Sequence, residues 1–151
     1  MSGAQTRPTM LPSIDDIADN FELLDDWEDR YRYLIELGRL MPDLPEADHT
    51  EANKVQGCAS QVWLKMTPEG NGADAKVAFL GDSDAHIVRG LVALLVAMLS
   101  GRPAGEIATS DPFTFFDRFG LGQHLTQQRS NGLRAMVDRI RAEAGRIAVP
   151  A

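Results

Sequence analysis

Apolar residues recur at three- and four-residue steps in four stretches of this chain, and each stretch predicts an amphipathic helix. The first begins after Ser13, whose side chain can cap the helix and which is followed three residues later by Asp16, close to a capping-box pattern. The second covers about residues 26–41. Pro42 and Pro45 end it, because proline lacks an N–H and clashes with the preceding turn.

The other two helices are predicted over about 84–100 and 127–147. Asp82, Ser83 or Asp84 can cap the earlier of the two, since a polar side chain accepts a free N–H there and a carboxylate favours the N-terminal partial charge. This helix also contains LVALLVAML, the longest unbroken apolar run in the chain. A bilayer span takes about 20 such residues, so the run predicts a buried helix and no membrane segment.

Between these helices the pattern changes to that of strands. The segments SQVWLKM and AKVAFLG are rich in β-branched and aromatic residues, and the turn cluster PEGNGAD between them predicts a hairpin. Residues 42–57 are polar and irregular, which indicates a surface loop, and proline and glycine break 102–120 into short helical turns. This order predicts an α+β fold, a small antiparallel sheet packed against helices. One domain is expected over 13–148, after a flexible tail over 1–12.

Composition and charge narrow the function. The chain has 151 residues, 44% of them hydrophobic and 25% charged, as in an ordinary globular domain. A formal net charge of −7 argues against general nucleic-acid binding, because neutralising phosphates needs a basic face. It leaves room for one protein partner with a complementary surface. The N-terminus has no apolar core of signal-peptide length, so a cytoplasmic location is expected.

Cys58 is the only cysteine, so the chain cannot form an internal disulfide. A lone cysteine is often a small apolar filler of the core. Here it lies at a junction between loop and strand, and Gly57 beside it lets another backbone or a ligand approach closely. Polar Gln56, Ser60 and Gln61 flank it, so the local sequence indicates no apolar pocket. These features favour a chemical role for the thiol.

Three kinds of chemistry are open to a single thiol. A cysteine hydrolase needs a histidine base, and the sequence places none of His49, His86 and His124 beside Cys58. A structural zinc site usually needs four ligands, and the chain has no paired ligand spacing. A thiol can also accept sulfur from the persulfide of a partner enzyme by thiol exchange, which requires a reachable cysteine without a second one nearby.

Four segments together resemble the SufE family. They are the loop N-x-V-x-G-C-x-S-x-V-W at 53–63, GDSDAHIVRGL at 81–91, LGQHLTQQRSNGLRAMVDRIR at 121–141 and WEDRYRYLIELGRLMPDLP at 27–45. CsdE proteins share these segments. The resemblance implies the α+β fold shared with IscU-type scaffolds. It also implies that Cys58 takes sulfane sulfur as a persulfide from a SufS-type, PLP-dependent cysteine desulfurase.

The same resemblance implies that the protein stimulates the desulfurase, passes sulfur to a SufB-containing scaffold, and carries neither a cofactor nor a metal of its own. The residues beside the thiol, Gly57, Ala59, Ser60 and Gln61, are expected to support the loop or contact the partner. Many family members have glutamine where this chain has Ala59. Two residues on other segments, Asp84 and Arg129, are also candidates for partner binding or loop support.

Several questions stay open at this level. Asp84 can serve as a helix cap, and Arg129 can be a solvated arginine at a helix start. The protein can be a monomer or a homodimer. It can act on a CsdA-type desulfurase, or it can be an adaptor that activates a partner without carrying sulfur. The leading hypothesis is that loop 50–60 swings Cys58 from a sheltered position into the desulfurase, since shelter slows oxidation of a thiol without a resolving partner.

Overall fold

The structure is a computed structural model, and it describes residues 11–149. Within this range the chain forms seven α-helices, one short 3₁₀ helix and three strands. The elements are, in chain order, α1 (Ile14–Leu23), α2 (Trp27–Leu40), η1 (Glu46–Asp48), β2 (Val62–Pro68), β3 (Lys76–Ser83), α3 (His86–Leu99), β4 (Arg102–Pro103), α4 (Ala104–Ala108), α5 (Phe113–Arg118), α6 (Leu121–His124) and α7 (Gln127–Ala148).

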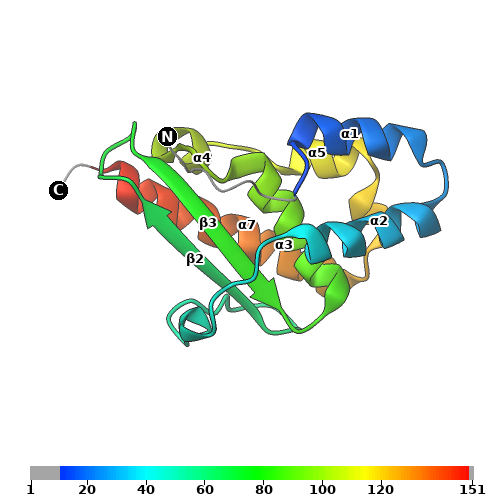
Figure 1. The fold of residues 1–151 in the computed structure, drawn as a ribbon, viewed down its shortest axis with the longest axis horizontal. Helices are drawn as coiled ribbons and strands as arrows, with labels where there is room; N and C mark the ends of the chain where they lie inside the picture. The colour runs from blue at the N-terminus through cyan, green and yellow to red at the C-terminus, as the bar shows by residue number, and fades with distance from the viewer. Residues whose placement is uncertain (1–10, 150–151) are drawn as a thin grey trace.

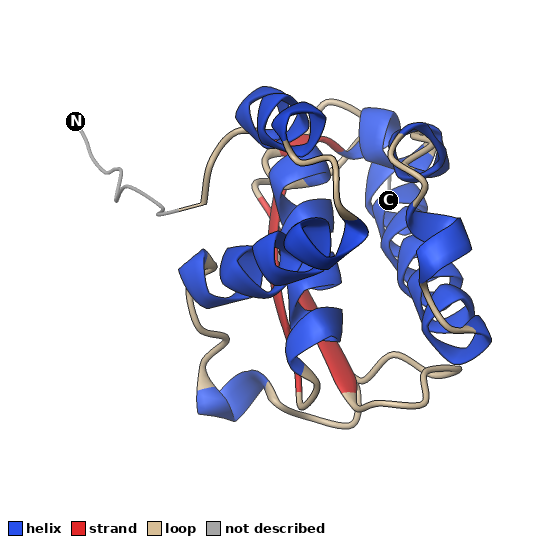
Figure 2. Ribbon diagram, turned by 90° about the vertical axis from the view of Figure 1, so that its right-hand side faces the viewer, coloured by secondary structure: helices blue, strands red, loops and turns tan. Residues whose placement is uncertain are grey.

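The strands form one antiparallel sheet in the order β2-β3-β4, and β4 adds only two residues to the edge of β3. In the hairpin, Leu64 lies opposite Gly81, and buried and more exposed positions alternate along both strands. In Figure 1 the hairpin lies in front, and α3 and α7 run behind it. Figure 2 shows the strands lying against a larger body of helices. The α+β prediction is therefore confirmed.

Helix α3 forms the centre of the core, because nine of its fourteen residues are buried. Helix α7 adds a buried stripe that includes Leu133, Met136 and Ile140, and α2 adds Leu34 and Leu37. Such burial of large side chains is the main stabilising term in a domain of this size. No helix within residues 11–149 is long and apolar enough to cross a membrane.

Helices α2 and α3 touch backbone to backbone through two glycines. A Cβ placed on Gly90 would lie 2.2 Å from the carbonyl oxygen of Leu34, and one on Gly38 would lie 3.0 Å from the Gly90 nitrogen. Neither contact leaves room for a methyl group, since the neighbouring atoms belong to helical backbone. The two glycines therefore set how closely α2 approaches α3, and with it the position of the loop that follows α2.

Most predicted elements agree with the structure within a few residues. Ser13 caps α1 by accepting the Asp16 N–H at 3.2 Å, and Asp26 caps α2 by accepting the Glu28 N–H at 3.0 Å. The two-residue strand β4 was not predicted. Of the expected tail 1–12, residues 1–10 lie outside the described residues, whereas Leu11 is buried in the core.

The prediction that a side chain from 82–84 caps α3 is wrong. The N-cap of α3 is Ala85, and no side chain caps this helix. Ser83 accepts the N–H of Ala85 itself. The Asp82 carboxylate instead bonds to His49 and Arg89, and the Asp84 carboxylate accepts from Gln61. A helix end can go without a side-chain cap when its carboxylates have stronger partners elsewhere.

We expect Gly90→Ala to destabilise the domain by about 2–3 kcal/mol, because the new methyl group forces α2 and α3 apart. Gly145→Ala is the matched control, since a Cβ at this α7 position meets nothing within 4 Å. That control should be neutral or stabilising by up to about 1 kcal/mol, the difference in helix propensity. Urea unfolding of both variants measures the effect, and equal stabilities would contradict the close approach.

Candidate functional site

Cys58 lies at the end of a narrow loop whose two arms are paired with each other. The Val55 N–H donates to the Val62 carbonyl, and the Leu64 N–H donates to the Asn53 carbonyl, both at 2.8 Å. At the tip, Gly57 has φ +91°, a left-handed conformation that other residues adopt only with strain. The backbone therefore turns sharply just before the thiol.

The sulfur of Cys58 is held against the N-terminal half of α7. Its S–H donates to the carbonyl of Gly132, with 3.6 Å between sulfur and oxygen. A small cavity of about 20 Å³ adjoins the thiol, which is room for about one water molecule. The cavity is lined by Cys58, Ala59, Ser60, Val88, Gln128, Arg129, Gly132 and Met136. This partly apolar shelter was missed, because Val88 and Met136 come from helices distant in sequence.

Burial raises the pKa of the Cys58 thiol, because a half-buried site disfavours the charged thiolate. No histidine lines the cavity among the described residues. His49 bonds to Asp82, His124 stacks on Trp27 with ring centroids 4.4 Å apart, and His86 is exposed. At rest the site therefore holds a neutral thiol without a base beside it.

Asp84 holds the arm of the loop that follows the thiol. Its carboxylate accepts the backbone N–H of Gln61 at 3.1 Å and the side-chain amide of Gln61 at 3.4 Å. The Asp84 N–H returns a hydrogen bond to the Gln61 carbonyl at 3.3 Å. The structure thus pairs these two predicted residues with each other, at the base of the loop and away from the cavity.

Arg129 is the other predicted residue, and it lines the cavity beside Cys58. Its guanidinium donates to the hydroxyl of Tyr31 at 3.2 Å, which places the side chain between α7 and α2. Its N–H also donates to the side chain of Thr126, the N-cap of α7. Four of the predicted residues therefore surround the thiol directly, namely Gly57, Ala59, Ser60 and Arg129.

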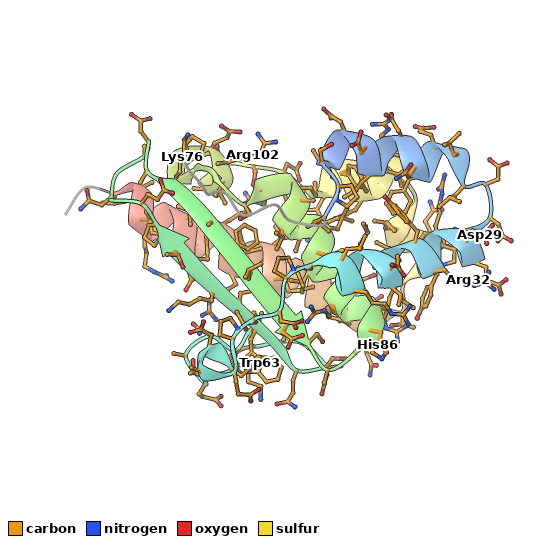
Figure 3. All side chains as sticks on the ribbon, viewed as in Figure 1. Asp29, Arg32, Trp63, Lys76, His86 and Arg102 are labelled. Atoms are coloured by element: carbon orange, nitrogen blue, oxygen red, sulfur yellow. The ribbon has the colours of Figure 1, made fainter. Side chains whose placement is uncertain are left out.

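Sequence reasoning missed a charged cluster at the open end of the hairpin, where the loop that carries Cys58 begins. His49, nine positions before the thiol, bonds through Nε2 to the Asp82 carboxylate at 2.7 Å, and its Nδ1 faces the Pro45 carbonyl at 3.1 Å. Asp82 also accepts from Arg89 at 2.6 Å. The rings of His49 and Trp63 lie in edge contact with centroids 4.8 Å apart, and Figure 3 shows Trp63 beside η1 at this end of the hairpin.

The pKa values in this cluster shift in opposite directions. The hydrogen bond to Asp82 raises the pKa of His49 above its usual value, although burial works against it. Burial by itself raises the pKa of Asp82, but hydrogen bonds from His49 and Arg89 outweigh it and the net pKa is lowered. Both shifts favour an ion pair. The only signal in the sequence was the pair of carboxylates in GDSD, which looked like helix caps.

No group of three or more His, Cys, Asp or Glu side chains that could hold a metal occurs within the described residues. A small α+β domain that presents one thiol on a sheltered loop is the class of protein that the fold and the site define together.

Comparisons with known proteins give the family. The family model described as "SufE: Fe-S metabolism associated domain" matches residues 15–144, and the chain belongs to this family. It is 58% identical over 134 residues to an uncharacterized SufE-like protein of Rhizobium etli, covering 89% of this chain and 90% of that protein. A SufE-like protein of Rhizobium meliloti, also uncharacterized, is 54% identical over 134 residues, which cover 89% of this chain and 96% of that protein.

A solved structure shares the fold. The solution structure of a hypothetical protein from Thermus thermophilus matches with a TM-score of 0.70 at 24% sequence identity. The match covers 91% of this chain and 97% of that one. The arrangement of helices and sheet therefore extends to proteins of distant sequence.

We expect alkylation of Cys58 to follow a pH dependence shifted upward by burial. In the folded protein the midpoint should lie above that of the same chain in concentrated urea, where a thiol titrates near about 8.5. Iodoacetamide rates across pH 6–10 measure both midpoints, so that the unfolded chain is its own control. A folded midpoint equal to or below the unfolded one would contradict the sheltered, neutral thiol.

Replacing His49 by glutamine should cost about 1 kcal/mol of stability where the ion pair exists. Because the pKa of His49 is raised on folding, its contribution is complete below about pH 6.5 and is lost as pH rises through the higher folded value. The pKa of Asp82 is lowered, so its charge persists down to about pH 4.

Urea unfolding at pH 5.5 and at pH 8.5 tests this dependence. The stability difference between wild type and His49→Gln should be larger at the lower pH. His86→Gln, at an exposed position at the start of α3, is the control. A difference that is the same at both pH values would show that the His49–Asp82 contact is not an ion pair.

Proposed function

We propose that this protein accepts sulfane sulfur as a persulfide on Cys58 from a SufS-type, PLP-dependent cysteine desulfurase. It stimulates that enzyme and passes the sulfur to a SufB-containing scaffold for Fe–S cluster assembly. The observation that carries the proposal is a lone thiol on a sheltered loop, beside a cavity with room for about one further atom. Membership of a family described as associated with Fe–S metabolism supports it.

The transfer step balances without an oxidant or a reductant. The Cys58 thiol loses its proton and the thiolate attacks the outer sulfur of the donor persulfide. A new S–S bond forms on Cys58, the old one breaks, and the donor cysteine leaves as a thiolate that takes up the proton. One thiol and one persulfide are present before and after, so only the position of the sulfane sulfur changes.

The resting geometry supports different roles for this protein, which shelters the thiol, and for the desulfurase, which activates it. Burial keeps the Cys58 thiol neutral, and a neutral thiol is a poor nucleophile. Sulfur transfer therefore requires the loop to leave the cavity, and the partner site supplies the environment that ionises the thiol. Arg129 lines the cavity and would give an anionic persulfide a cationic neighbour after the loop returns.

Two alternatives make different predictions. A CsdE-like acceptor would use a CsdA-type desulfurase in the same chemistry. An adaptor would activate the desulfurase through its surface and leave Cys58 unmodified. The location in the cytoplasm, where such enzymes would meet this protein, belongs to the same proposal.

We expect Cys58→Ser to abolish sulfur acceptance and most of the stimulation of the desulfurase. After incubation with SufS-type desulfurase and cysteine, mass spectrometry should show one added sulfur on Cys58 of the wild type and none on the variant. Gly145→Ala, near the C-terminal end of α7 and outside the cavity lining, is the control and should keep both activities. Full stimulation by Cys58→Ser would support the adaptor and overturn the proposal.

A further inference from the structure

One arginine of α7 grips the arm of the loop that leads to Cys58. Arg139 donates from Nη1 to the Lys54 carbonyl at 3.0 Å and from Nη2 to the Ala52 carbonyl at 2.7 Å. Its Nε faces the Glu143 carboxylate at 3.3 Å, one helical turn further along. A guanidinium is a rigid fork, so binding two carbonyls and one carboxylate at once fixes both its position and theirs.

These residues belong to one face of α7 that lies along the loop. A Cβ on Gly132 would lie 3.5 Å from the Cys58 sulfur, and the Ala135 side chain lies 3.4 Å from where a Gly57 Cβ would be. Gly132, Ala135, Arg139 and Glu143 are spaced by three and four residues, the spacing of a single helical stripe. The stripe therefore holds both the thiol and the arm before it.

The contacts of Arg139 hold the arm of the loop rigidly. The side chains of Arg139 and Glu143 are both only 23% exposed, so water competes weakly for their bonds. The more exposed Arg146 also lies 3.8 Å from the same carboxylate oxygen of Glu143. Hydrogen bonds from a charged donor are stronger than neutral ones. The two arms are also paired, through Val55 with Val62 and through Leu64 with Asn53.

We propose that Arg139, positioned by Glu143, locks residues 52–55 onto α7, so that release of Cys58 moves only residues 56–60. The hinges are then Gly57 and the junction at Gln61, which Asp84 holds. This is narrower than the moving segment 50–60 expected from the sequence. The meaning of this lock for sulfur transfer rests on the proposed function, but the lock itself is a property of the isolated protein.

The experiment measures how often the loop opens in the absence of any desulfurase. In Arg139→Ala, iodoacetamide should modify Cys58 about tenfold faster at neutral pH, because two charge-assisted bonds that hold the arm are lost. Arg141→Ala is the matched control: it removes the same charge from α7, and Arg141 makes no hydrogen bond or ion pair within the described residues. Its rate should stay within about twofold of wild type.

Native-state hydrogen exchange separates a lock from a general loss of stability. In Arg139→Ala the Val55 and Leu64 amides, which close the arms, should exchange faster, whereas the buried core amide of Met136 should not. Arg139→Lys should rescue only part of the protection, since an ammonium lacks the planar fork. Glu143→Gln should give a smaller increase in alkylation and covers the case in which Arg139→Ala fails to fold.

Unchanged alkylation and unchanged exchange at Val55 and Leu64 would overturn the lock. Faster exchange at Met136 in parallel with the arm would also overturn it, since that result indicates an ordinary stabilising residue. Neither result touches the proposed function, because Cys58→Ser in the desulfurase assay tests sulfur acceptance separately.

Discussion

The position from which the Cys58 loop starts depends on the contacts of Arg89. This side chain of α3 is 16% exposed and donates to the Gly38 and Met41 carbonyls at the end of α2, at 2.7 and 3.1 Å. It also binds Asp82 at the end of β3 at 2.6 Å. The guanidinium of Arg89 thus joins the end of α2 to the end of β3. Through Asp82 it is also linked to His49. The loop that carries the thiol leaves from this junction, so its origin is fixed before its tip is placed.

The thiol itself is stabilised in a form that cannot react. Burial and the contact with the Gly132 carbonyl both favour the protonated sulfur. This state protects the thiol from oxidation, because a thiolate is the species that oxidants attack. The cost is that reaction requires the loop to move, and the left-handed turn at Gly57 lies where that movement begins. The sheltered position of Cys58 and the position in which it can react therefore differ only by the movement of one short segment.

The sequence predicted those features that depend on near neighbours along the chain. Ser13, the two prolines after α2 and the hairpin turn each act within a few residues, and the helices and strands they bound agree with the structure. The failures concern contacts between distant segments. Asp84 looked like a helix cap, because nothing local shows that Gln61 competes for it. Nothing local in the sequence singles out Arg139, since the carbonyls that it binds lie more than eighty residues away.

The short movable segment, residues 56–60, also limits how far the Cys58 thiol can move. Cys58 lies three positions after Val55 and three positions before Gln61, and three extended residue steps span about 10 Å. With both arms held, the thiol cannot travel further than this from the end of the hairpin. Under the proposed function, a sulfur donor at the bottom of a deep, narrow shaft is thus out of range. Such a donor would have to offer its sulfur near a rim wide enough to admit the end of the β2–β3 sheet, or carry it outward on a segment of its own.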